Sequence, residues 1–225
     1  MRTIAIGDIH GCLTSLVALV KHAGITRDDT IVTLGDYVDR GPDSRGVIDY
    51  LLRLRREQRV VSLLGNHELL MLGARESPQA LDWSQNELVG GAATLESYGL
   101  YDIRGIPPHN LDFIENCLPY HETDSHFFVH ANADPALPLD EQDERHLYWK
   151  RFGEPEPHRS GKVMVCGHTS QSSGEPLDVG HALWIDSKAY GGGWLSAYDP
   201  GNGHYWQTNE QGRRREGQTA PRPRP

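Results

Sequence analysis

Three short phrases near the start of the chain combine glycine with acidic, imidazole and amide side chains: Gly7-Asp8-Ile9-His10-Gly11, Gly35-Asp36-Tyr37-Val38-Asp39-Arg40-Gly41 and Gly65-Asn66-His67-Glu68. Each phrase follows an apolar run rich in β-branched residues, over 3–6, 30–34 and 60–64. Such runs predict buried strands, and open α/β sheets build their sites at the carboxyl ends of buried strands. The phrases therefore predict a functional site at one edge of a sheet.

Between and after these phrases, apolar residues recur at the spacing of one helix face, over 13–20, over 47–54 and from Leu69 onward. Strands that alternate with helices are typical of βαβ units, so this part of the chain predicts a parallel sheet. Further helices are expected at two places, over 78–98 with a break at Gly90-Gly91, and over 111–116.

The second half of the chain changes character. Three apolar runs predict buried strands, over 126–129, 162–166 and 182–185. The turn signal Asp199-Pro200-Gly201-Asn202-Gly203 separates two more strand-like runs and predicts a hairpin. We expect all of these strands to form a second sheet, more antiparallel than the first and packed against it. The predicted fold class is therefore α/β, with both sheets in a single domain.

From Thr208 onward the composition shifts to glutamine, arginine, glycine and proline, ending in Ala220-Pro221-Arg222-Pro223-Arg224-Pro225. A segment of this kind has too little apolar surface to form a core. The prediction is a folded domain over 1–207 followed by a disordered, Arg/Pro-rich tail over 208–225.

Charge and cysteine content narrow the class of protein. The formal net charge of −9 argues against bulk attraction to nucleic acid or to an anionic membrane. Three cysteines without a CxxC spacing argue against a disulfide framework and fit a reducing compartment. The first residues lack a signal-peptide pattern, and no apolar stretch is long enough to span a bilayer. The expectation is a cytoplasmic protein, and the sequence does not indicate its oligomeric state.

The residue types at the expected strand ends are those of a metal centre. Asp8 and His10 lie two positions apart, so both side chains point the same way at a strand end. Asp36 ends the neighbouring strand and has two oxygens with which to bridge two ions. Oxygen and imidazole ligands without thiolate suit manganese, iron or zinc. The predicted ligands are Asp8, His10, Asp36, Asn66, His130 and His168, the last two after strands of the second half.

The order GD-x-HG, GD-x-VDRG and GNHE resembles the signature of the calcineurin-like metallophosphoesterases. More narrowly, it is similar to the phosphoprotein phosphatase family of serine/threonine phosphatases, including short bacterial and phage members. The likeness continues through Val129-His130-Ala131 and Gly167-His168-Thr169 and so covers about residues 3–200. It implies a four-layer α/β/β/α sandwich, with 1–207 as the catalytic domain.

The resemblance also divides the ligands between two ions. It implies that Asp8, His10 and Asp36 hold the first, and that Asp36, Asn66, His130 and His168 hold the second. Two such ions share a water molecule and lower its pKa. The expected reaction is in-line attack of a metal-bound hydroxide on a phosphate monoester, with no covalent intermediate.

Three further residues are predicted to handle the leaving group and the phosphate. His67 is the candidate general acid, and the resemblance pairs it with Asp39, which would orient the ring. Arg40 offers a bidentate fork for phosphate oxygens. Asn66 and His67 are expected to contact the phosphate as well. The resemblance adds Arg151 as a second phosphate-binding arginine, and Glu68 is expected to support the loop.

Three functions compete. The leading hypothesis is a phosphatase acting on phosphoserine and phosphothreonine, with phosphotyrosine as a further candidate, in a phosphoprotein or phosphopeptide. The second is a hydrolase of diadenosine tetraphosphate and related dinucleoside polyphosphates, because the bacterial symmetrical enzymes of that class share much of the signature. The third is a non-catalytic scaffold, which should have lost ligands. Asp186-Ser187-Lys188 departs from the Asp-Thr-Gly of many relatives, which leaves the substrate preference open.

Overall fold

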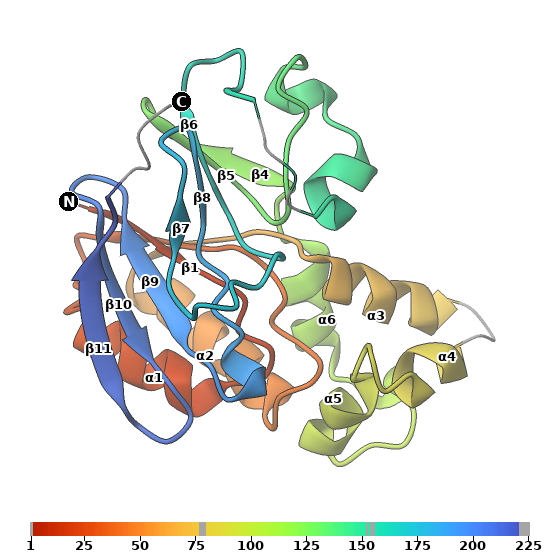
Figure 1. The fold of residues 1–225 in the computed structure, drawn as a ribbon. Helices are drawn as coiled ribbons and strands as arrows, with labels where there is room; N and C mark the ends of the chain where they lie inside the picture. The colour runs from red at the N-terminus through yellow and green to blue at the C-terminus, as the bar shows by residue number, and fades with distance from the viewer. Residues whose placement is uncertain (1, 77–79, 152, 154–155, 221–225) are drawn as a thin grey trace.

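The computed structural model describes residues 2–76, 80–151, 153 and 156–220, and it contains two packed β-sheets (Figure 1). The first sheet has the strand order β11-β10-β9-β1-β2-β3, in which β1, β2 and β3 are parallel and the other three are added antiparallel. Its strands are β1 (Thr3–Ile6), β2 (Thr30–Thr33), β3 (Arg59–Ser62), β9 (Leu195–Asp199), β10 (His204–Thr208) and β11 (Arg214–Gln218).

Alternation along β1 explains how the first sheet is covered on both faces. Ile4 and Ile6 pack into a core with the helices α1 (Leu13–His22) and α2 (Ser44–Glu57). Ala5, between them, faces the second sheet. Because successive side chains of a strand point to opposite faces, one short run serves two apolar layers. The helices expected over 13–20 and 47–54 are confirmed.

The second sheet has the order β4-β5-β6-β8-β7 and is mixed, with parallel β5, β6 and β8 between antiparallel edge strands. Its outer face is covered by short helical turns, η2 (Leu139–Glu141) and η3 (Arg145–Trp149), so the predicted four layers are present and the fourth is the thinnest. Its strands are β4 (Tyr120–Glu122), β5 (His126–Val129), β6 (Val163–Cys166), β7 (Leu177–Asp178) and β8 (Ala182–Trp184).

A group of helices lies at one side of the sheets (Figure 1). These are α3 (Asn66–Glu76), α4 (Ala80–Gln85), α5 (Gly91–Tyr98), η1 (Ile103–Gly105) and α6 (Pro108–Glu115). The helix α4 packs against both α3 and α5. The break expected at Gly90-Gly91 is confirmed, because α5 begins there. Positions 77–79 of the predicted helical stretch lie outside the described residues.

Two expectations for the end of the chain are wrong. The hairpin β9–β10 joins the first sheet instead of the second, since β9 pairs with β1. Within the tail expected to be disordered over 208–225, β11 pairs with β10 along its whole length. Arg215 helps to hold it, because its guanidinium stacks 4.4 Å from the Trp194 ring and donates to Gly174 O. Positions 221–225 lie outside the described residues.

The cysteines and helices add two plain facts. Cys12, Cys117 and Cys166 are all unpaired, and the first and last of them are buried. Within the described ranges, no helix has both the length and the apolarity that a bilayer crossing requires.

Candidate active site

Three loops converge at the carboxyl ends of β1, β2 and β3. The first two are joined by backbone hydrogen bonds, because Ile9 N and His10 N both donate to Asp36 O, at 3.0 and 2.7 Å. Asn66 and His67 form the first turn of α3, where the sequence predicted a strand end. Each loop is therefore anchored to a second element, which fixes the side chains that it presents.

Backbone conformation is unusual at these positions. Among the described residues, six non-glycine residues have positive φ, and five of them are predicted site residues: His10 (46°), Asp36 (50°), Asp39 (70°), Arg40 (69°) and His168 (58°). A side chain with a Cβ rarely adopts this left-handed conformation without a compensating constraint. Such strain gathers at functional sites, so the backbone independently marks the region that the sequence predicts.

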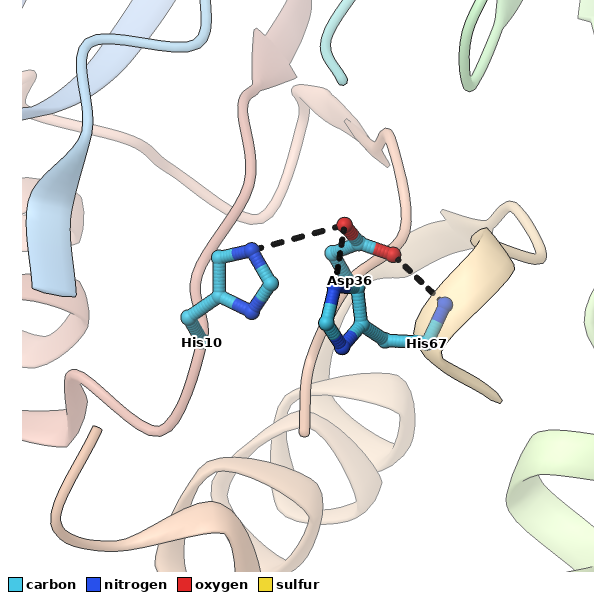
Figure 2. A group of neighbouring side chains, drawn as sticks. All are labelled: His10, Asp36 and His67. Carbon is cyan, nitrogen blue, oxygen red and sulfur yellow. Dashed lines mark hydrogen bonds and ion pairs between the residues drawn. The ribbon is translucent and has the colours of Figure 1, made fainter. Parts of the chain in front are cut away.

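Asp36 lies between two imidazole rings (Figure 2). Its Oδ2 is 3.4 Å from His10 Nε2 and 4.0 Å from His67 Nε2, while its Oδ1 accepts the backbone N–H of His67 at 3.1 Å. All three side chains are buried. His10 Nδ1 donates to Val38 O at 2.9 Å, and burial lowers the pKa of His10 to about 3. The ring is therefore neutral, and its Nε2 accepts from Arg40 Nη1 at 2.9 Å.

A second group gathers on the other side of Asp36. His130 Nδ1 donates to Leu34 O at 2.8 Å, which leaves Nε2 facing Asn66 Oδ1 at 2.9 Å and Asp36 Oδ1 at 3.5 Å. His168 Nε2 donates to Trp149 O at 3.2 Å, so its Nδ1 faces the same Asn66 oxygen at 2.9 Å. Burial lowers the pKa of His168 to about 4, which keeps that ring neutral.

These contacts bring hydrogen-bond acceptors against one another. The lone pair of His168 and the oxygens of Asn66 and Asp36 all point at one small volume. Acceptors held together in a buried place repel each other unless a cation lies among them. Oxygen and imidazole donors of this kind match a divalent transition metal, so the residues present fit the predicted second ion.

The site also contains several buried carboxylate groups close to one another. Burial, then Asp186 and Asp36, raise the pKa of Asp8 well above its usual range, although the backbone N–H of His168 donates to both Asp8 oxygens. Asp186 was not predicted as a site residue. It is buried beside this cluster and accepts from Ser170 Oγ at 2.5 Å and from Lys188 N at 2.8 Å. Three buried aspartates around one point favour the binding of positive charge.

Glu68 has the supporting role expected of it. Its carboxylate accepts the backbone N–H groups of Asp36 (2.8 Å), Tyr37 (2.7 Å), Val38 (3.2 Å) and Gly65 (3.0 Å). It thereby ties the loop after β2 to the start of α3. Burial and the nearby Asp36 raise the pKa of Glu68 to about 8.

His67 and Asp39 form a buried pair. His67 Nδ1 lies 2.7 Å from Asp39 Oδ2, so Nε2 is the ring nitrogen left to face the site. Burial lowers the pKa of His67, but Asp36 and Asp39 outweigh it and raise the pKa above its ordinary value. Two further donors to Asp39, Trp83 and Thr94, were not predicted from the sequence.

These groups open onto a cavity of about 230 Å³. Its lining residues are Asp36, Arg40, Asn66, His67, Arg151, His168, Thr169, Ser170 and Tyr190. Both predicted arginines are present, Arg40 half-buried and Arg151 exposed. Tyr190, which the sequence did not single out, lies 4.6 Å from the Arg40 guanidinium. The cavity thus combines two guanidinium groups, a candidate proton donor and the cluster of acceptor atoms. These are the groups that binding and cleavage of a phosphate ester require.

Comparison with known proteins agrees with this chemistry. The family model described as calcineurin-like phosphoesterase matches residues 1–200. Serine/threonine-protein phosphatase 1 of Salmonella typhimurium is 40% identical over 204 residues, covering 85% of this chain and 88% of that protein. The symmetrical bis(5'-nucleosyl)-tetraphosphatase of Salmonella paratyphi B is 45% identical over 73 residues, covering 32% of this chain and 25% of that protein.

A solved structure is similar over almost the full length. It is a protein described provisionally as a diadenosine tetraphosphatase, with a TM-score of 0.69 and 25% identity. The match covers 96% of this chain and 93% of that one. The two-sheet architecture and its helices are therefore shared with that structure.

Proposed function

The chain belongs to the calcineurin-like phosphoesterase family, and we propose that it is a protein phosphatase acting on phosphoserine and phosphothreonine. That it is a phosphoesterase enzyme follows from the family. The narrower substrate is our proposal, and its main support is the phosphatase relative that aligns with 88% of its own length. The proposal extends to phosphotyrosine as a further substrate of the same site.

The proposed metal ligands are the six that the sequence motifs indicate. Asp8, His10 and Asp36 would hold one ion, and Asp36, Asn66, His130 and His168 would hold the other. Manganese, or a pair of iron and zinc, suits these donors. When bound, such ions supply positive charge for the phosphoryl oxygens and an activated water nucleophile.

The chain's own side chains then have separate tasks. Arg40 and Arg151 would bind and orient the phosphate oxygens, together with Asn66 and His67. His67 would hold a proton on Nε2 and give it to the departing alkoxide as the bond from phosphorus to the ester oxygen breaks. Asp39 would stay ionised and keep the ring in the tautomer that this transfer needs.

Cavity size favours a monoester at the end of a larger molecule. At about 230 Å³, the cavity is smaller than the ~300–1,000 Å³ typical of sites that enclose a whole small molecule. A phosphorylated side chain would place its phosphoryl group inside and leave its polypeptide outside. A phosphoprotein or phosphopeptide is the proposed partner, and the unpaired cysteines are compatible with a cytoplasmic location.

The alternative substrate is a dinucleoside polyphosphate. The tetraphosphatase relatives favour it, although their match covers only 32% of this chain. The same ligands and the same acid would serve a phosphoanhydride, so the metal centre does not separate the two substrates.

A side-by-side assay tests the proposal. Purified protein is given a phosphoserine peptide, diadenosine tetraphosphate or p-nitrophenyl phosphate, with manganese and again after chelation. We expect metal-dependent turnover of the peptide with a higher kcat/KM than of the dinucleotide. A higher kcat/KM for diadenosine tetraphosphate would establish the alternative, and turnover that survives chelation would contradict the metal centre.

A further inference from the structure

Asp39 is held by more donors than its pairing with His67 requires. Its side chain is fully buried. Oδ2 accepts from His67 Nδ1 at 2.7 Å and from the indole Nε1 of Trp83 at 3.1 Å. Oδ1 accepts from the hydroxyl of Thr94 at 2.8 Å. A carboxylate is an acceptor only, so each of these contacts has one possible direction.

Each hydrogen bond of the Thr94 hydroxyl can be assigned a direction. Its single proton goes to Asp39 Oδ1, and its oxygen accepts the backbone N–H of Asp39 at 2.8 Å. Ser44 Oγ, 3.1 Å away, must then be the donor to Thr94. Thr94 is therefore hydrogen-bonded to both the backbone and the side chain of Asp39. The backbone of Asp39 has a φ of 70°, one of the left-handed values described above.

Both donors come from the helical group beside the sheets. Trp83 lies on α4 and Thr94 on α5, and both side chains are buried. A Cβ on Gly91 would lie 2.5 Å from the Trp83 ring, so the missing side chain at Gly91 makes room for the indole. The segment between the two helices also touches the site, because Gly90 O accepts the backbone N–H of Arg40 at 3.1 Å.

We propose that Trp83 and Thr94 are positioning residues that fix the Asp39 carboxylate, and through it the His67 ring, for proton donation to the leaving group. The inference rests on the proposed function of His67 as the general acid. In it, the proton on His67 Nε2 passes to the departing oxygen as the phosphorus–oxygen bond breaks, and the ring is left neutral. Neither Trp83 nor Thr94 is among the residues that line the cavity.

The competing explanation is that both residues only fill the core. Trp83 does contribute to the large apolar cluster on the helix side of the first sheet. The two explanations differ in what a single lost hydrogen-bond donor does. Trp83→Phe keeps an aromatic ring and removes the indole N–H, and Thr94→Val keeps the shape and removes the hydroxyl. Thr94→Ser restores that hydroxyl.

The leaving group provides the decisive measurement. A serine alkoxide is a strong base and needs a proton to depart, whereas p-nitrophenolate leaves without one. We expect Trp83→Phe and Thr94→Val to lower kcat about tenfold on a phosphoserine peptide, a fraction of the about 10²–10⁴-fold that a positioned acid contributes. On p-nitrophenyl phosphate kcat should change less than about twofold, KM should stay constant on both esters, and Thr94→Ser should match the wild type.

Tyr98 offers a matched control. It lies on α5 like Thr94, is buried, and has a hydroxyl without a hydrogen-bond partner among the described residues. Tyr98→Phe should leave both activities unchanged. An equal loss on the two esters, or no loss on the peptide, would overturn the positioning role.

A readout that needs no turnover separates this inference from the proposed function. In protein labelled with ¹⁵N-histidine, the proton on His67 Nδ1 should resonate at low field, assigned by its absence in His67→Asn. Trp83→Phe and Thr94→Val should shift it, and Thr94→Ser and Tyr98→Phe should not. An unmoved resonance rejects the inference, whereas a wild type that hydrolyses neither ester rejects the proposed function alone.

Discussion

Buried aspartates lie at both ends of β1 and β2, but their surroundings differ between the two ends. At their amino ends, the Asp29 carboxylate accepts from Arg2 N and Arg2 Nη2 at 3.0 and 2.7 Å, and from Thr26 N and Oγ1 at 3.0 and 3.1 Å. The hydrogen bonds from Arg2 hold the pKa of Asp29 well below its usual range. At their carboxyl ends, burial and the nearby carboxylates of Asp186 and Asp36 raise the pKa of Asp8 well above its usual range.

The contrast separates structure from function. Asp29 finds all of its donors within the chain, so its charge stabilises the fold as it stands. Asp8 is buried beside Asp186 and Asp36, so its charge is only partly balanced by the chain itself. A buried carboxylate whose neighbours cannot balance it is the mark of a place where something else binds.

The strongest test of this contrast is Asp36→Asn. We expect turnover to fall to background and bound metal to be lost, because one neutral oxygen cannot replace a carboxylate shared by two ions. Metal content by elemental analysis, together with peptide turnover, checks it. Two ions bound at full occupancy would refute the bridging role.

The next largest effect is expected from His67→Asn. Turnover of the phosphopeptide should drop about 10²–10⁴-fold because the general acid is lost. Metal content should stay at the wild-type level, since the six proposed ligands are intact. Steady-state kinetics and elemental analysis on the same preparation measure both. Wild-type turnover in this variant would remove His67 from the mechanism.

A smaller change is expected from Arg151→Ala. Arg151 is exposed at the cavity, so losing its charge should raise KM about threefold to tenfold and leave kcat nearly unchanged. The difference from wild type should shrink at high salt, which screens exposed charges. Kinetics at two ionic strengths measure it, and a fall in kcat at constant KM would contradict simple phosphate binding.

The smallest effect on activity is expected at the other end of the strands. Asp29→Asn should leave turnover unchanged and lower the free energy of unfolding by about 1–2 kcal/mol at pH 7. Because the folded pKa of Asp29 is lowered, its stabilisation is complete above the unfolded pKa of about 3.9 and is lost as the pH falls below it. Urea unfolding at pH 7 and at pH 3 should show the deficit shrinking in acid, and a constant deficit would contradict the ion-pair origin.

Much of this site could be predicted from the sequence because its residues follow strands directly. His130 and His168 follow neighbouring parallel strands, β5 and β6, and so share one edge of the second sheet. The packing of the second sheet against the first then brings them to Asp36. Trp83 and Thr94 carry no such signal. From the sequence alone, a tryptophan on an amphipathic helix looks like any core residue, because only the structure shows which group its indole N–H donates to.

The wrong prediction of disorder at β11 has a similar cause. Residues 214–218 contain no apolar side chain, so composition alone indicates disorder. The strand forms because β10 offers an open edge and because Arg215 packs its guanidinium on Trp194. Neither an edge nor a stacking partner distant in sequence can be inferred from local pattern.

The left-handed backbone at the site has a consequence for how such a protein would evolve. Each non-glycine residue in that conformation costs roughly 1 kcal/mol, so the five site positions together cost an appreciable share of the roughly 5–15 kcal/mol that holds a domain folded. Selection for heat resistance without selection for turnover should therefore replace Asp36 or His168 with glycine, whereas Asp39 would be retained because its carboxylate satisfies three buried donors. Catalytic ability would be the first property that such a lineage loses, well before its fold.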